Sequence, residues 1–294
     1  MQTPSLIRTF DPASSPSSFS PSIPSPIGIF DSGYGGLTVF REIAAKLPQY
    51  DYLYLGDNAR TPYGTRSFET VYHYTLQAVE WFFRQGCDLV ILACNTASAK
   101  ALRSIQQIDL PKYSEEKRVL GVIRPTAEII GNYSKTSQIG ILATNGTVQS
   151  DSYPIEIQKF FPQIQVHQQA CPMLVPLIEN NEHNSDGAKY FIGKYVRELL
   201  GNHRHIDTIL LACTHYPLIK EHIKHYLPPE TALLTQGEIV ADSLQDYLSR
   251  HPQMAERISK HGRQAFYTTD DQYSFDLHAT RFFGKPIISN QIHF

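Results

Sequence analysis

Two stretches of similar sequence, Leu89–Ser98 (LVILACNTAS) and Thr208–Pro217 (TILLACTHYP), decide the fold. Each begins with an apolar run that predicts a buried strand, ends that run in Ala-Cys, and continues into the expected start of a helix. The cysteines, Cys94 and Cys213, are 119 residues apart (213 − 94), about one domain length. The repeat predicts two similar α/β domains, each with a cysteine at the strand edge where open α/β sheets bind ligands.

The rest of the chain alternates in the same way between apolar runs and segments of helical period. Continuous apolar strands are typical of parallel sheets that helices cover on both faces. We expect the strands to be Ile27–Phe30, Tyr52–Leu55, Asp88–Ala93, Val119–Ile123, Gln138–Ala143, Asp207–Ala212, Ala232–Thr235 and Ala265–Thr269. The expected helices include Gly36–Leu47, Phe68–Arg84, Thr96–Gln107, Asp186–Leu200, Pro217–Tyr226 and Ile239–Leu248.

The composition is typical of a soluble globular protein that binds a small molecule. Of the 294 residues, 41% are hydrophobic and 18% charged, and the formal net charge is −2. This near-neutral balance predicts no nucleic-acid partner. No stretch approaches the roughly 18 consecutive apolar residues of a membrane span. A secretory signal is not recognisable either, so we expect a cytoplasmic protein with reduced thiols.

The beginning of the chain differs from the rest. Ser and Pro fill 12 of the 16 positions from Asp11 to Pro26. Such a segment cannot bury enough apolar surface to offset the entropy lost on ordering. We therefore expect residues 1–26 to form a disordered Ser/Pro-rich tail outside the fold.

The four cysteines follow no metal-binding pattern, since the chain has no CxxC pair and no zinc-type spacing. Cys87 and Cys171 are interpreted as buried core residues. Cys94 and Cys213 share matching contexts, which favours a chemical role. A thiol acts as a base only when ionised, and a helix N-terminus lowers its pKa from about 8.5. Both are expected at such a turn; their wide separation disfavours a thiol redox enzyme.

Three further segments are candidates for the site. Asp31–Gly36 (DSGYGG) follows the first strand; it can bring backbone close to a ligand and hold an anion at the next helix, although a plain turn is the alternative. The third glycine of a dinucleotide fingerprint would fall on Thr38, which disfavours that reading. Thr61–Gly64 predicts a turn that either faces a ligand or lies at the surface. His215 is close enough to Cys213 in sequence to exchange protons with it, although a structural role is the alternative for a single His beside a strand end.

With these motifs identified, the sequence resembles the glutamate racemases of the aspartate/glutamate racemase superfamily. The resemblance covers Ile27 through Gly284. Its motifs, in family order, are IFDSGYGGLTV, GDNARTPYG, LACNTAS, GVIRP, ATNGTVQSDSY, CPMLVPLIE and LACTHYP. The presence of both CNTAS and CTHYP points specifically to glutamate racemases. Aspartate and hydantoin racemases share the two-cysteine design but are not expected to carry CTHYP.

The resemblance implies two α/β domains with the active site in the cleft between them and no cofactor. Residues 27–117 with 232–294 are expected to form the first domain, which carries Cys94. Residues 118–231 are expected to form the second domain, which carries Cys213. The C-terminal part of the chain would thus return to complete the first domain.

The resemblance also implies roles for individual residues in interconverting L- and D-glutamate for peptidoglycan synthesis. Cys94 would deprotonate D-glutamate and Cys213 L-glutamate, assisted by Asp31 and His215 respectively, with Glu179 as a supporting carboxylate. The substrate-contacting positions would be Asp31, Ser32, Tyr63, Gly64, Asn95, Thr96, Thr214 and His215.

The chemistry requires two opposed bases, since one base cannot readily reach both faces of the α-carbon. With each sulfur roughly 3–3.5 Å from that carbon, the two would stand about 6–7 Å apart. A pyridoxal enzyme would need a Schiff-base lysine, but Lys100 is expected to be solvated. Backbone amides near Asn95, Thr96 and Thr214 are the candidates for stabilising the carbanion.

Some positions depart from the family pattern, and other functions stay open. Thr235-Gln236-Gly237 stands where the family commonly has DSG, Thr269-Asp270 replaces a Gly-Asp turn, and Tyr34 is larger than expected. The alternatives are a racemase for aspartate or a hydantoin, and a non-catalytic amino-acid-binding protein on the same scaffold. The sequence leaves open whether the chain forms a homodimer.

Overall fold

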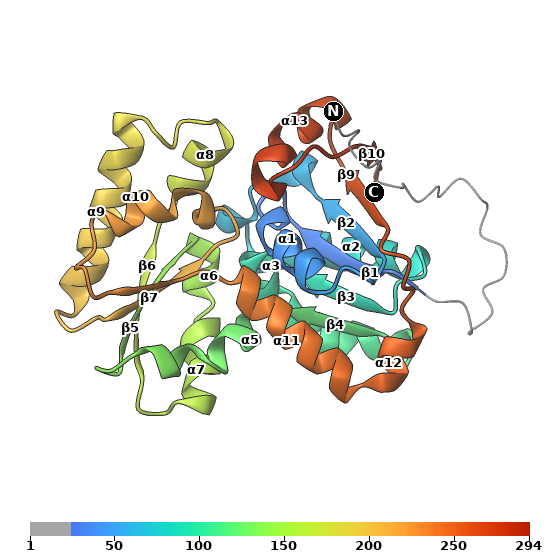
Figure 1. The fold of residues 1–294 in the computed structure, drawn as a ribbon, viewed down its shortest axis with the longest axis horizontal. Helices are drawn as coiled ribbons and strands as arrows, with labels where there is room; N and C mark the ends of the chain where they lie inside the picture. The colour runs from blue at the N-terminus through green and yellow to red at the C-terminus, as the bar shows by residue number, and fades with distance from the viewer. Residues whose placement is uncertain (1–24) are drawn as a thin grey trace, which may run out of the picture.

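Every apolar run expected to form a strand does so, and the strands assemble into two sheets. The computed structural model describes residues 25–294 and places the sheets side by side, each flanked by helices (Figure 1). The first sheet has the order β10-β9-β2-β1-β3-β4, and the second β6-β5-β7-β8. All neighbouring strands pair in parallel. The expected α/β class with parallel sheets is confirmed.

The strands of the first sheet are β1 (Ile27–Asp31), β2 (Tyr52–Gly56), β3 (Leu89–Leu92), β4 (Arg118–Gly121), β9 (Gln264–Thr268) and β10 (Ser289–Gln291). Those of the second are β5 (Gln138–Ala143), β6 (Gln165–Ala170), β7 (Thr208–Ala212) and β8 (Ala232–Leu234). The helices are α1 (Leu37–Lys46), α2 (Phe68–Arg84), α3 (Asn95–Lys100), α4 (Leu102–Ser104), α5 (Ile123–Ala127), α6 (Asn145–Gln149), α7 (Ser152–Phe160), α8 (Leu174–Glu179), α9 (Asp186–Asn202), α10 (Lys220–Lys224), α11 (Gly237–Arg250), α12 (Pro252–Arg257) and α13 (Gln272–Phe283).

The two sheets repeat one strand order, β2-β1-β3-β4 in the first and β6-β5-β7-β8 in the second. In each repeat, the second strand along the chain lies on one side of the first strand, and the third and fourth strands lie on its other side. The crevice between the first and third strands is where open α/β sheets bind ligands. Cys94 follows the third strand of one repeat, β3, and Cys213 follows the third strand of the other, β7. The topology therefore puts both cysteines at equivalent points.

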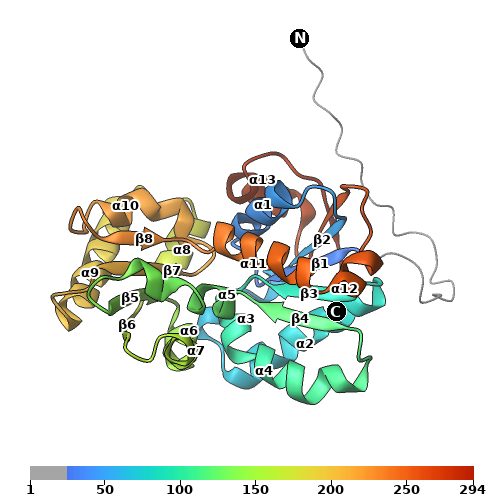
Figure 2. The same ribbon diagram turned by 60° about the horizontal axis from the view of Figure 1, so that its bottom comes forward.

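The expected bounds of the two domains need correction at both crossings. β4 pairs with β3 in the first sheet, so the chain crosses after Gly121 rather than before residue 118. β8 pairs with β7 in the second sheet, so the chain returns after Leu234 rather than before residue 232. Both bounds were placed one strand too early because a short edge strand does not show in its sequence which sheet it joins. After Leu234 the chain runs through α11 (Figure 2) to β9 and β10 of the first sheet (Figure 1).

The fold also includes two residues that were assigned to the tail. Ser25 and Pro26, assigned to the tail, are buried. The Ser25 amide donates to the Arg257 carbonyl at 2.7 Å, and Ser25 forms a parallel bridge with Ile258. The remainder of the expected tail, residues 1–24, lies outside the described residues.

Several elements differ from their predicted form. The helix expected over residues 96–107 is divided into α3, α4 and a π-helical turn over Ile105–Asp109. The helix expected over residues 217–226 is a 3₁₀ turn, Tyr216–Ile219, followed by α10. β6 (QVHQQA) was missed because it is a half-exposed edge strand without an apolar run. Its polar residues suit that position.

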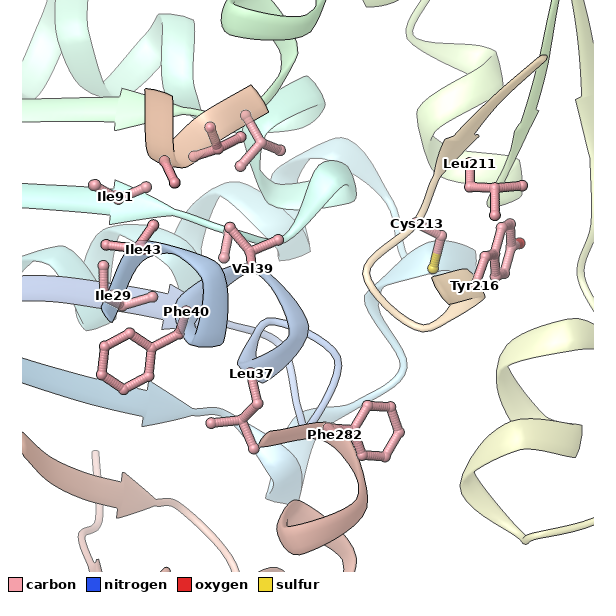
Figure 3. Packing of buried hydrophobic residues seen from close by; sticks show 14 of the residues in the cluster. Ile29, Leu37, Val39, Phe40, Ile43, Ile91, Leu211, Cys213, Tyr216 and Phe282 are labelled. Atoms are coloured by element: carbon pink, nitrogen blue, oxygen red, sulfur yellow. The ribbon is translucent and has the colours of Figure 1, made fainter. Parts of the chain in front are cut away.

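One apolar cluster runs through both domains. On the α1 side of the first sheet it contains Ile29 and Phe40, and it continues to Leu211 and Tyr216 of the second domain. Figure 3 shows Phe282 and Cys213 where this cluster passes from one domain to the other. Burial of shared apolar surface therefore holds the domains together.

Within the part of the chain that the structure describes, no helix is both long and apolar enough to cross a membrane.

A buried carboxylate ties together the starts of two neighbouring strands, β2 and β9. Asp51 is 2% exposed and accepts from the backbone amide and guanidinium of Arg263 at 2.8 and 3.0 Å, and from the His261 amide at 3.2 Å. Burial alone would raise the pKa of Asp51, but the hydrogen bonds from Arg263 and His261 outweigh it and hold the pKa well below its usual value.

Replacing Asp51 with Asn should therefore destabilise the protein near pH 7, by about 1–3 kcal/mol. The folded pKa is depressed, so the stabilisation is present above the unfolded value near 3.9 and is lost as pH falls through the folded value. Urea unfolding at pH 7 and toward pH 3 should show the difference from wild type shrinking below about pH 4. Asp246→Asn, in an exposed pair with Arg250, is the control with little effect at either pH. A difference that persists unchanged to pH 3 would contradict this account.

Candidate active site

A cavity lies between the domains, at the carboxyl ends of strands from both sheets. The first domain contributes the loops after β1, β2 and β3, and the second those after β5, β6 and β7. The lining residues are Ser32, Thr61, Pro62, Tyr63, Gly64, Thr65, Cys94, Asn95, Thr96, Thr144, Asn145, Cys171, Pro172, Val175, Pro176, Cys213, Thr214 and His215. All the site residues expected from the sequence line it except Asp31 and Glu179.

Cys94 sits at the N-cap of α3 and is 5% exposed. Its Sγ accepts from the Ala97 amide at 3.4 Å, and its thiol donates to Ser32 Oγ at 3.5 Å. Burial raises the pKa of Cys94 to about 12, and the charge of Asp31 adds to the rise. The expected lowering by the helix N-terminus was wrong in its net direction, since desolvation outweighs the helix amide. Such a pKa favours the protonated thiol at neutral pH.

Cys213 faces the cavity from the second domain in a different local setting. β7 ends at Ala212, but the next helical turn begins only at Tyr216, so Cys213 lies outside it rather than at a helix start as expected. Its Sγ is 3.8 Å from Nδ1 of His215. Figure 3 shows the sulfur beside the Tyr216 ring. His215, rather than a helix terminus, is therefore the polar group poised to assist this thiol.

His215 is held on three sides and is 3% exposed. Besides the contact with Cys213, its Nε2 is 2.9 Å from Oε1 of Glu179, and Phe282 packs edge-on at a centroid distance of 5.3 Å. Burial alone would lower the pKa of His215, but the hydrogen bonds to Cys213 and Glu179 outweigh it and raise the pKa well above its ordinary value. The arrangement favours an imidazolium that can exchange a proton with Cys213.

Asp31 is fully buried at the end of β1 and links the domains. It accepts from the Gly33 amide at 3.0 Å and from Thr214 Oγ1, in the second domain, at 3.4 Å. Burial raises the pKa of Asp31, although the nearby His215 opposes the rise. Asp31 does not line the cavity itself, but it contacts Thr214, which does.

The loops of the two domains meet at very short range. A Cβ on Gly35 would lie 2.2 Å from Thr214 Oγ1 and 2.5 Å from His215 Nδ1. On the opposite wall, a Cβ on Gly64 would lie 2.9 Å from Cβ of Thr144. Glycine is required at Gly35 for this close approach, which puts His215 over the first domain's loop.

Hydrogen bonds hold the hydroxyl and amide groups of the cavity wall, and two of these bonds join the domains. Thr96 Oγ1 and Thr144 Oγ1 are 2.9 Å apart, and Tyr153 donates to Oδ1 of Asn95 at 2.6 Å. Tyr63 donates a very short hydrogen bond to Asp57. These contacts fix the donors and acceptors that surround a ligand in the cavity.

Sequence reasoning missed the wall that the second domain contributes after β5 and β6. Thr144 and Asn145 follow β5, an expected strand, so the strand-end rule could have found them directly. The same rule would have found Cys171 had β6 been recognised. Cys171 is buried as expected, but it also lines the cavity.

Lys100, expected in solvent, is 6% exposed and donates to the Arg66 carbonyl at 2.6 Å. Across residues 25–294, no three His, Cys, Asp or Glu side chains are grouped so as to hold a metal ion.

Comparison with known proteins bears on the family of the chain. Asp31–Ala241 match the family described as Asp/Glu/Hydantoin racemase. The chain is 39% identical over 273 residues to the glutamate racemase of Paracoccus denitrificans, covering 89% of this chain and 97% of that protein. The chain belongs to the Asp/Glu/Hydantoin racemase family. Both the expected family and the expected class, an amino-acid racemase, are confirmed.

Solved structures place the racemase among two-domain relatives. It superposes on a glutamate racemase from Bacillus anthracis with a TM-score of 0.83 at 32% identity, covering 92% of this chain and 98% of that one. For the glutamate racemase from Francisella tularensis in complex with D-glutamate, the TM-score is 0.79 at 29% identity, with 91% and 97% covered. The fold of this racemase is thus that of known glutamate racemases along most of its length.

Proposed function

We propose that this racemase interconverts L- and D-glutamate by moving one proton between Cys94 and Cys213. The observation that carries the proposal is that the two thiols line one cavity from opposite domains. Both thiols are buried there, with exposed fractions of 5% for Cys94 and 6% for Cys213. A ligand between them is accessible to a base on each face of its α-carbon.

The environments of the two thiols support an asymmetric resting state. For L-glutamate, Cys213 as thiolate, next to the His215 imidazolium, removes the α-proton, and the Cys94 thiol returns a proton to the opposite face. Cys94 is then the thiolate and Cys213 the thiol, which is the state that D-glutamate requires for the reverse reaction. One proton leaves and one arrives in each turnover, so the step balances without an oxidant or a further acid.

The α-carbanion needs stabilisation that a pyridoxal cofactor would otherwise supply. Backbone amides at Asn95, Thr96 and Thr214 are the candidate donors, because all three residues line the cavity. Donors held by a folded scaffold stabilise developing charge best where little water competes. All three residues are buried, which supports this role.

Glutamate is the proposed substrate because the similar proteins are glutamate racemases, one of them solved with D-glutamate bound. We further propose that the product D-glutamate serves peptidoglycan synthesis and that the enzyme acts in the cytoplasm. Aspartate and hydantoins are the competing substrates. A glutamate-binding protein without turnover is the competing function.

The deciding assay follows the circular dichroism of L- and D-glutamate with purified protein and no pyridoxal phosphate. Both enantiomers should approach the racemate, and in D₂O each product should carry deuterium at the α-carbon. Aspartate and hydantoins are run in parallel. Faster turnover of either would overturn the substrate assignment, and glutamate binding without α-proton exchange would overturn racemisation.

The Glu179–His215 pair predicts a pH effect. In Glu179→Gln the neutral amide no longer favours the imidazolium, so the pKa of His215 should fall. The imidazolium then loses its proton at lower pH. The alkaline limb of kcat/KM for L-glutamate, which reports groups of the free enzyme, should shift to lower pH.

Glu182→Gln is the matched control for this experiment. Glu182 is exposed shortly after α8, the helix that ends at Glu179, and should leave the profile unchanged. An alkaline limb that does not move in Glu179→Gln would show that this carboxylate does not act through His215.

A further inference from the structure

A closed ring of hydrogen bonds joins the two domains next to the cavity. Asn95 Nδ2 donates to Gln236 Oε1 at 2.7 Å, Gln236 Nε2 donates to the Tyr153 hydroxyl at 2.7 Å, and that hydroxyl donates to Asn95 Oδ1 at 2.6 Å. The exposed fractions of Asn95, Tyr153 and Gln236 are 2%, 0% and 3%. Water therefore cannot readily replace any member of the ring.

The direction of every bond in the ring follows from a single backbone carbonyl. Val122 O lies 3.1 Å from the Gln236 amide and can only accept, so the atom facing it must be Nε2. Gln236 then presents Oε1 to Asn95, whose facing atom must be the donor Nδ2. Asn95 in turn presents Oδ1 to Tyr153, which must donate. The orientation of the Asn95 amide is thus set by Gln236.

Gln236 also stands where the chain passes between the domains. It lies between β8 and α11, in the return crossing, while Val122 lies between β4 and α5, in the outward crossing. The Gln236 amide is also 3.0 Å from Thr126 Oγ1, in α5. One side chain of the return crossing therefore bonds to the outward crossing and to Asn95, the residue that follows Cys94. This residue is the middle one of the Thr235–Gly237 departure from the family pattern.

We propose that Gln236 is a positioning residue of the active site, acting through the Asn95 carboxamide. The proposal rests on the proposed function, because the residue it positions adjoins Cys94 and lines the cavity. In the observed orientation Asn95 uses one amide hydrogen for Gln236 and keeps the other for a ligand. A flipped Asn95 would present its oxygen instead, which repels an anionic substrate such as a carboxylate.

Two substitutions test this role. Gln236→Met keeps the length of the side chain and removes all its hydrogen bonds, so kcat/KM for glutamate should fall about 10-fold as Asn95 loses its fixed orientation. Gln236→Glu can satisfy Val122 O only when protonated. Burial raises the pKa of such a carboxyl above about 4.3. The ratio of its kcat/KM to that of wild type should therefore be highest near pH 5 and fall as pH rises to 8.

The pH-dependent ratio is a signature that a merely structural residue would not produce. Gln245→Glu, at an exposed position of α11, is the matched control and should give a flat ratio. A Tyr153→Phe, Gln236→Met double variant should be about as slow as the slower single variant, because both act on the same amide.

The outcomes separate the two proposals. An inactive wild-type protein refutes the proposed function, and the positioning role falls with it. An active wild type, with Gln236→Met at full kcat/KM or with Gln236→Glu as flat in pH as Gln245→Glu, refutes the positioning role alone. A thermal unfolding midpoint recorded for each variant shows that the protein assayed is folded.

Discussion

Replacing either Cys94 or Cys213 with Ser is expected to lower the racemisation rate by on the order of 10²–10⁴-fold, the usual contribution of a positioned general acid or base. Each direction needs one sulfur as base and the other as acid, so neither variant can complete the inversion efficiently. The measurement is circular dichroism of glutamate at saturating substrate, starting from each enantiomer.

Isotope exchange sharpens this prediction, because it detects proton removal without inversion. In D₂O, Cys94→Ser should keep exchange at the α-carbon of L-glutamate, whose proposed base is Cys213, and lose it for D-glutamate. Cys213→Ser should show the reverse. Cys87→Ala removes a thiol buried in the core away from the cavity and should keep full activity. Full racemisation in either serine variant would refute the two-base scheme.

Gly35→Ala is expected to have the second largest effect, a fall in kcat/KM of about 100-fold. This is the loss typical when a catalytic group is displaced by about 1 Å. The new Cβ would lie 2.2 Å from Thr214 Oγ1 and 2.5 Å from His215 Nδ1. Glu179 and Phe282 hold the His215 ring in place, so the ring cannot simply rotate away. The domains must separate locally, which moves His215 relative to Cys213.

Steady-state kinetics with L-glutamate and thermal unfolding test this together. Gly201→Ala is the control, since a Cβ there meets nothing within 4 Å, and it should retain activity with a small gain in stability from helix propensity in α9. Near-normal kcat/KM in Gly35→Ala would show that the contact between the loops is not required for catalysis.

The sequence was a good guide wherever a local pattern carried the information. Apolar runs located the strands of both sheets except β6 and β10, and the Ala-Cys ends of β3 and β7 led to the two thiols that line the cavity. It failed at β6, whose edge position permits polar residues, and at the crossings, because pairing partners of edge strands are set by contacts distant in sequence. Because β6 was missed, the place of Cys171 at the cavity was missed as well.

Local sequence was enough to predict the parallel α/β class and the internal repeat, since strand burial and strand-end position follow from residue periodicity. The protonation of the site depended on three-dimensional packing. Burial raises the pKa of Cys94 against its helix amide, and Glu179, in a different element from Cys213, completes the setting of His215. The Asn95–Tyr153–Gln236 ring likewise unites three distant segments. Desolvation and hydrogen bonding act through space, so only the folded chain reveals them.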